Sequence, residues 1–131
     1  MSVLLNHTIV WCRDKKESAR YLTDTLGLPE AKPWGPFMVV DMGNDVSLDY
    51  HDVADMDDAI ASQHYAFLVS EADFGEIFGR IEESGQDYWA DPGLGHKGEV
   101  NRRDGGRGVY FKDPDGHLLE ILTRPYGSGG G

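Results

Sequence analysis

One pattern of strands and a helix occurs twice in this chain, and this repetition constrains the fold more than any other feature of the sequence. The first copy opens with a β-rich segment at 3–11, followed by a helix that is capped at Asp14 and ends at Gly27. Two further strands are predicted at 37–42 and 46–50. A short and weak second strand falls in the proline-punctuated segment between Gly27 and residue 37, so the order is that of a βαβββ module.

The second copy repeats this order from residue 63 onward. A β-rich segment at 63–69 leads into a second capping signature at Ser70, and the helix that follows ends at Gly85. The remaining strands are predicted at 87–90, 107–112 and 117–123. The sequence therefore predicts an α+β protein built from two βαβββ modules.

The domain boundaries follow from the same pattern. One domain is expected over 1–125, made of module one at 1–52, a connector at 53–62 and module two at 63–125. The connector is rich in Asp and Ala, so it offers little to bury. Residues 126–131 are predicted to be a flexible tail.

The register between the two copies pairs residues that are unusual in strands. Aligning the first strands places His7 on His64, and aligning the last strands places Asp49 on Glu120. A carboxylate in a half-buried strand is costly unless charged or coordinating groups meet it. Two competing interpretations remain: a Glu120 that points to solvent, since alternating strands show one face to water, and strand histidines that are merely structural.

If the first and last strands of each module are adjacent, His7, His64 and Glu120 converge inside one curved sheet. Imidazole and carboxylate together suit a divalent first-row metal, and two histidines with one carboxylate leave open positions for substrate or dioxygen. Asp49 is a candidate fourth ligand. The expected cofactor is therefore a divalent metal ion such as Fe, Mn, Zn or Ni.

The charge balance argues against several kinds of partner. The formal net charge is -11, which disfavours binding to nucleic acid or to an anionic membrane. The single Cys12 cannot form an internal disulfide, and the first residues are too soon polar for a signal peptide. No apolar run approaches membrane-spanning length. We expect a cytoplasmic protein whose partner is a small molecule.

The segment 91–108 is too long and too polar for a simple hairpin. It is either a mobile flap over a site or a plain surface loop. Its glycines do not form a phosphate loop, because a strand rather than a helix N-terminus follows them.

Most aromatic residues are expected in the core, because small sheets bury aromatic side chains routinely. If the sheet curves, some of them line a cleft that suits a planar aromatic ligand. The candidate substrate-binding residues are Trp34, Phe37, Tyr50, Trp89, Arg103 and Tyr110.

The most specific motif is Asp-Pro-Asp-Gly-His-Leu-Leu-Glu at 113–120, a turn that delivers a strand with one carboxylate. Together with His7 and the strand that begins at His64, it resembles the vicinal oxygen chelate superfamily. That superfamily includes glyoxalase I, bleomycin-resistance proteins, fosfomycin-resistance transferases and extradiol dioxygenases. The resemblance implies that paired βαβββ modules form a partly open, mixed β-barrel around the site.

The resemblance also implies roles for individual residues. It assigns His7, His64 and Glu120 as metal ligands, and it makes Glu120 and Asp49 the catalytic carboxylates. Members are commonly homodimers with the site near the subunit interface, while related resistance proteins only sequester a drug. We expect a metal-dependent glyoxalase- or dioxygenase-like protein acting on an oxygenated substrate that chelates the metal. The alternative is a non-catalytic antibiotic-resistance protein that binds a hydrophobic aromatic drug.

Overall fold

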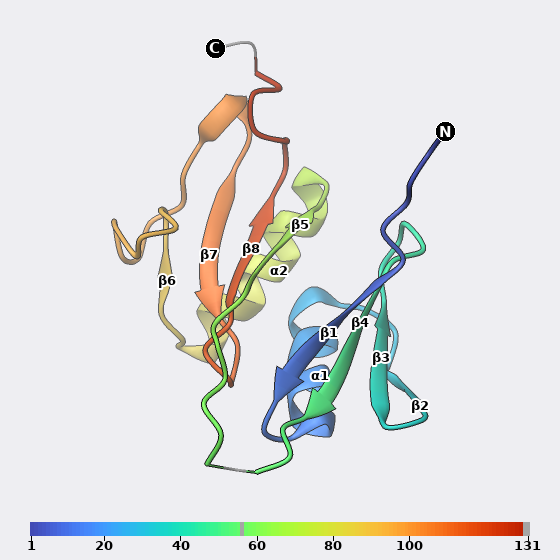
Figure 1. The fold of residues 1–131 in the computed structure, drawn as a ribbon. Coiled ribbons are helices and arrows are strands. Elements are labelled where there is room, and N and C mark those ends of the chain that lie inside the picture. The colour runs from blue at the N-terminus through green and yellow to red at the C-terminus, as the bar shows by residue number, and fades with distance from the viewer. Residues whose placement is uncertain (56, 130–131) are drawn as a thin grey trace. The chain divides into compact units, whose positions relative to one another are not determined.

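The computed structural model describes residues 1–55 and 57–129, in two compact units. Unit 1, Met1–Ala61, contains β1 (His7–Cys12), α1 (Lys15–Leu26), β2 (Lys32–Trp34), β3 (Phe37–Asp41) and β4 (Ser47–Asp52). Unit 2, Ser62–Gly131, contains β5 (His64–Leu68), α2 (Glu71–Ser84), β6 (Tyr88–Trp89), the 3-10 helix η1 (Arg103–Gly105), β7 (Gly108–Lys112) and β8 (Leu118–Leu122). The two predicted βαβββ modules and the α+β class are confirmed (Figure 1).

Each unit forms one four-stranded mixed sheet, in the orders β1-β4-β3-β2 and β5-β8-β7-β6. The first and last strands of each unit are adjacent and parallel. The other pairs are antiparallel. Hydrogen bonding between strands therefore builds two separate sheets in the described part of the chain, and does not close them into one barrel.

Both helices begin and end at the predicted residues. The Asp14 side chain accepts hydrogen bonds from two backbone N–H groups of the first turn of α1, and the Ser70 hydroxyl accepts one from the first turn of α2. Gly27 and Gly85 end the helices in the left-handed conformation, with φ of 70° and 75°. These boundaries could be predicted because the capping contacts are local in sequence.

The first strand is shorter than predicted, since β1 begins at His7 rather than at residue 3. His7 lies opposite Ser47, where β4 begins, so among the described residues the β1–β4 ladder starts at this pair. Val3, Leu4 and Leu5 are exposed. The β propensity of residues 3–6 is thus not sufficient to form a strand where no neighbouring strand in the described part of the chain pairs with them.

One face of each sheet packs against the helix of its own unit (Figure 1). In unit 2, the buried residues Phe74, Ile77 and Ile81 of α2 provide the helix side of the core. The strand residues Val109, Phe111, Leu119 and Ile121 are fully or almost fully buried. Because side chains alternate along a strand, their neighbours Tyr110 and Glu120 lie on the other face, which we call the open face.

The Asp-Pro-Asp-Gly turn before β8 is held by its own side chains. One carboxylate oxygen of Asp113 accepts hydrogen bonds from the backbone N–H groups of Asp115 and His117 at 2.9 and 2.8 Å. Gly116 has a φ of +85°, a conformation that glycine adopts without strain. The His117 ring is buried and its Nδ1 accepts from Gln63 N–H, which ties the turn to the start of β5. His117 is thus a structural histidine.

None of the helices formed by the described residues is long and apolar enough to cross a membrane.

Candidate functional site

A histidine and a buried glutamate meet on the open face of unit 2. In the parallel β5–β8 ladder His64 pairs with Leu118 and Ala66 with Glu120, so the two side chains start two positions apart along one face. The Nε2 atom of His64 lies 3.1 Å from Oε1 of Glu120. Glu120 is only 1% exposed, whereas the His64 side chain is 45% exposed. The pair thus has one buried and one accessible partner.

A backbone carbonyl sets the orientation of the His64 ring. Nδ1 lies 2.9 Å from the carbonyl oxygen of Leu118, and because a carbonyl only accepts, Nδ1 carries the proton. In the neutral ring, Nε2 then directs a lone pair at the carboxylate of Glu120. These two groups attract one another when a proton or a metal cation lies between them.

Two tyrosines complete the surroundings of Glu120. The Tyr126 hydroxyl donates a hydrogen bond to Oε2 of Glu120, and the hydroxyls of Tyr110 and Tyr126 are 2.6 Å apart. Burial, and then the hydrogen bond to Glu120, raise the pKa of Tyr126 well above its ordinary value. Burial likewise raises the pKa of Tyr110. Both phenols therefore remain protonated donors at neutral pH.

The ring of His64 also stacks on the ring of Tyr110, with centroids 5.8 Å apart and planes at 27°. Two of the predicted substrate-binding residues lie beside this cluster. Trp89 pairs with Tyr110 in the β6–β7 ladder. Arg103 interacts electrostatically with Tyr110 and Tyr126 and forms an ion pair with Asp91.

The segment between β6 and β7 is folded back on itself. Asp91 binds both Arg103 and His96, the latter at 2.5 Å between Oδ2 and Nδ1. The Asn101 side chain donates to the carbonyl of Ala90 at 2.8 Å. These contacts place η1 beside the open face of unit 2, and a mobile flap stays a prediction.

The equivalent residues in unit 1 do not form such a pair. His7 is exposed, and its Nδ1 lies 2.7 Å from the side-chain oxygen of Asn6. Asp49 is half-buried, and Oδ1 accepts a hydrogen bond of 2.8 Å from the Ser47 hydroxyl. The register is the same as in unit 2, because His7 pairs with Ser47 and Ile9 with Asp49.

Aromatic side chains gather on the face of the unit 1 sheet that carries Asp49 and lies opposite the core residues Leu48 and Tyr50, which we call the open face of unit 1. The ring of His51 lies 4.9 Å from that of Trp11 and meets Phe37 edge-on at 5.2 Å. Trp34, on the edge strand β2, is 72% exposed. Tyr50 is 1% exposed and belongs to the core. Alternation turns Tyr50 toward the helix side of β4, away from Asp49, and a role of Tyr50 in binding substrate stays a prediction.

The donor set of unit 2 fits a divalent cation. A histidine whose Nδ1–H is held by a carbonyl is oriented for binding metal through Nε2. Two ligands bound at about 2.1 Å and about 90° apart are separated by about 3 Å, which agrees with the 3.1 Å between Nε2 and Oε1. No group of three or more His, Cys, Asp or Glu side chains forms a cluster among the described residues. His64 and Glu120 thus provide two donors of a site that needs further ligands.

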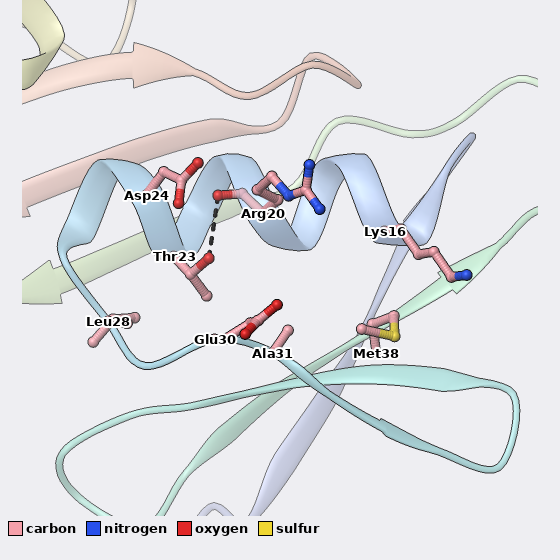
Figure 2. Close-up of a pocket in the computed structure, with 8 residues that line it drawn as sticks. All are labelled: Lys16, Arg20, Thr23, Asp24, Leu28, Glu30, Ala31 and Met38. Atoms are coloured by element: carbon pink, nitrogen blue, oxygen red, sulfur yellow. Dashed lines mark hydrogen bonds between the residues drawn. The ribbon is translucent and has the colours of Figure 1, made fainter.

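A pocket in unit 1 is a separate feature. It has a volume of about 410 Å³ and lies between α1 and the chain that follows it (Figure 2). Its lining residues are Lys16, Arg20, Thr23, Asp24, Leu28, Glu30, Ala31 and Met38. Met38 pairs with the core residue Tyr50, so the pocket is on the helix side of the sheet. It contains neither His7 nor Asp49.

Sequence reasoning missed three residues of the two open faces. Tyr126 was assigned to a flexible tail, although its position after Pro125 and so soon after β8 was a usable signal. Trp11 and His51 were overlooked, although alternation along β1 and β4 places them on the face of His7 and Asp49. Gly130 and Gly131 of the predicted tail, and Met56 of the predicted connector, lie outside the described residues.

The chain belongs to the Glyoxalase/Bleomycin resistance protein/Dioxygenase superfamily, whose family model matches residues 4–121. The predicted membership of the vicinal oxygen chelate superfamily is thereby confirmed. The structure of Oxidase ChaP-H2 is 62% identical, with a TM-score of 0.94, over 98% of this chain and 99% of that chain. Oxidase ChaP-H1 is 60% identical, with a TM-score of 0.92, over 96% and 99% of the two chains. Glutathione transferase FosA from Serratia marcescens is 32% identical over 120 residues, which are 89% of this chain and 78% of that protein.

Proposed function

We propose that this protein is a divalent-metal-dependent oxidase of a small oxygenated molecule that chelates the metal through adjacent oxygens. The observation that carries the proposal is the His64–Glu120 pair, in which a carbonyl-anchored imidazole directs its lone pair at a buried carboxylate. The identity of 60% and 62% to two oxidases supports oxidation over isomerisation. Dioxygen is the proposed electron acceptor.

The proposed ligands are His64 and Glu120 together with His7, whose place in unit 1 is equivalent to that of His64. The metal, with Fe, Mn, Zn and Ni as candidates, would supply Lewis-acid stabilisation of negative charge on the substrate oxygens. Asp49 is proposed as the base that removes a substrate proton, because its half-buried carboxylate has a hydroxyl donor rather than a cation beside it. Glu120 and Asp49 thus have different tasks.

The remaining residues are proposed to bind and orient the substrate. Tyr110 and Trp89 would form one wall beside His64, and Arg103 would bind a negatively charged substrate group. Phe37 and Trp34 would provide apolar surface from unit 1. We also propose a homodimeric, cytoplasmic protein with its site near the subunit interface, as in the superfamily it belongs to.

Metal content tests this function directly. Protein purified without chelator is expected to hold about one divalent ion per chain by plasma mass spectrometry, and oxygen uptake with chelating diols as probes is expected to require it. His64→Ala and Glu120→Ala should each lose the ion. His51→Ala is the matched control, since it removes a histidine of an open face that is not a proposed ligand. A wild-type protein without stoichiometric metal would rule out the metal-dependent function.

A second candidate function is sequestration of a hydrophobic aromatic drug. It is favoured by the exposed Trp11 and Trp34 and the half-buried Phe37 on the open face of unit 1. Tight binding of an aromatic antibiotic that survives metal removal, with the compound recovered unchanged, would support it. Recovery of an altered compound would exclude it.

A further inference from the structure

The residues that follow β8 bring a hydroxyl group to the buried carboxylate of the site. We call residues 124–129 the strap. Within it Tyr126 is 56% exposed as a whole, yet its hydroxyl reaches Glu120, which is 1% exposed. A residue that is more than half exposed while its hydroxyl contacts a buried carboxylate depends on the backbone that carries it for its position.

The strap has a dedicated anchor at η1. Both carboxylate oxygens of Asp104 accept backbone hydrogen bonds from the strap, from Gly127 N–H at 3.1 Å and from Gly129 N–H at 3.2 Å. The Ser128 carbonyl accepts from the Arg124 side chain at 3.0 Å. Tyr126 therefore lies between two fixed points, the end of β8 and the Asp104 carboxylate.

Two glycines allow this path. Gly127 has a φ of +81°, which a residue with a side chain adopts only with strain. A Cβ added to Gly129 would lie 2.6 Å from backbone atoms of Asp104, so the two segments are in direct backbone contact. A strap of other residues would not approach η1 so closely.

The hydrogen bonds around Glu120 run in one direction. Tyr126 donates its only hydroxyl proton to Oε2, so in its contact with the Tyr110 hydroxyl, 2.6 Å away, Tyr126 is the acceptor. Oε2 thus accepts a hydrogen bond from Tyr126, whereas Oε1 faces Nε2 of His64. The two oxygens of one carboxylate have been given different partners.

We propose that Tyr126 is a positioning residue that holds the Glu120 carboxylate with Oε1 alone directed toward the metal position beside His64. This inference rests on the metal-dependent function proposed above. Tyr110 in turn donates a hydrogen bond to the Tyr126 hydroxyl and so helps to hold that hydroxyl against Glu120. Hydrogen bonds to a ligating carboxylate commonly fix its orientation and contribute to metal affinity.

The test compares three variants by titrating metal-free protein with cobalt(II) and recording its visible absorption. Tyr126→Phe removes only the hydroxyl and is expected to weaken cobalt binding about 10- to 100-fold, with a changed band pattern because Glu120 can bind through both oxygens. Asp104→Ala, which frees the strap but keeps the phenol, should change affinity in the same direction by a smaller factor. Tyr88→Phe is the control, since its ring packs edge-on against Phe78 on the helix face.

Each outcome of these measurements either supports or overturns the positioning role of Tyr126. Cobalt affinity and bands of Tyr126→Phe that equal those of the wild type, at an unchanged melting temperature, would overturn the positioning role. If the wild type binds no cobalt, the proposed function fails, and crystal structures of the two metal-free proteins then test the inference. A Glu120 carboxylate that turns away from His64 only in Tyr126→Phe supports the positioning role, and an unmoved carboxylate overturns it.

Discussion

The two units share one strand register, but a histidine–carboxylate contact forms only in unit 2. In each ladder the histidine lies two positions before the residue that pairs with the carboxylate. Glu120 is one methylene longer than Asp49 and reaches Nε2 of His64, whose ring is anchored on a carbonyl. Asp49 instead binds the Ser47 hydroxyl. The shared register therefore puts a histidine and a carboxylate on neighbouring strands of both units. The length of the carboxylate side chain and the hydrogen bond that holds the histidine ring decide whether the two interact.

The connection between the second and third strands is the other difference between the units. In unit 1 only Gly35 and Pro36 separate β2 from β3, whereas residues 90–107 separate β6 from β7. That longer segment carries Arg103 and Asp104, which contact the site and anchor the strap. The longer segment 90–107 is thus the part of unit 2 that gives it a candidate site which unit 1 lacks.

The largest expected effect comes from making the carboxylate of unit 2 as short as that of unit 1. Glu120→Asp is expected to lose the contact with His64 and to weaken metal binding about 100-fold, the upper end of what disturbed ligand orientation costs. Metal titration by calorimetry measures this. Asp49→Asn is the matched variant in unit 1, and it should keep the wild-type affinity while lowering turnover. Equal affinity losses in both variants would contradict the division of tasks.

A second comparison concerns how tightly the glycines of the two units are packed. A Cβ on Gly106 would lie 2.5 Å from Oγ1 of Thr123, whereas a Cβ on Gly43 would meet no atom within 4 Å. Gly106→Ala is therefore expected to lower the free energy of unfolding by about 1–3 kcal/mol. Gly43→Ala should be neutral or raise it by at most about 1 kcal/mol. Urea denaturation measures the free energy of unfolding of both variants. An unchanged value for Gly106→Ala would show that Thr123 and Arg124 move aside at little cost.

The helix caps provide a smaller contrast. The Asp14 carboxylate accepts from the backbone N–H groups of Lys16 and Glu17, both at 3.1 Å, whereas the Ser70 hydroxyl accepts only from Asp73 N–H. Asp14→Ala is expected to cost about 1–2 kcal/mol and Ser70→Ala about 0.5–1 kcal/mol. Thermal unfolding of both variants checks the order. A reversed order would mean that the number of capped groups does not set the cost.

The smallest effect is expected in the segment that unit 1 lacks. The hydrogen bond from His96 to Asp91, followed by the charge of that carboxylate, raises the pKa of His96 above 6.5, and the hydrogen bond to His96 lowers the pKa of Asp91 below 3.8. The contribution of a raised histidine pKa to stability is complete below pH 6.5 and is lost as the pH rises through the raised value. The contribution of Asp91 is present above pH 3.8 and is lost as the pH falls through its lowered value.

NMR titration of the His96 ring measures this directly. The pKa of His96 should fall toward 6.5 in Asp91→Asn, because the hydrogen bond and the charge that raise it are removed. A His96 pKa that is unchanged in Asp91→Asn would show that the contact does not persist in solution.

Most of the fold could be predicted because it depends on contacts between residues close in sequence. Asp14, Ser70, Gly27 and Gly85 mark the helix boundaries through groups at most a few positions away. The turn before Glu120 is likewise closed by its own Asp113 and Gly116. The pairing of His7 with His64 and of Asp49 with Glu120 was also visible, because the two copies share one order of elements.

Other features depended on partners distant in the chain. The extent of β1 depends on where β4 begins, which is why its predicted start at residue 3 was wrong. Tyr50 is in the core because its position on β4 faces the buried side. Tyr126 reaches Glu120 only because Asp104, held in a turn with a φ of +56°, anchors the glycines that follow.

The sequence by itself determined the doubled βαβββ architecture, the family and the two candidate pairs of histidine and carboxylate, since capping, turns and alternation are encoded locally. Only the tertiary structure decided that His64 and Glu120 meet, that a carbonyl sets the His64 tautomer, and that Tyr126 takes the second carboxylate oxygen. The physical reason is that a contact of about 3 Å between side chains distant in sequence forms only when the strand register, the side-chain lengths and the path of the backbone together bring the two groups close. No single segment of the chain specifies all three.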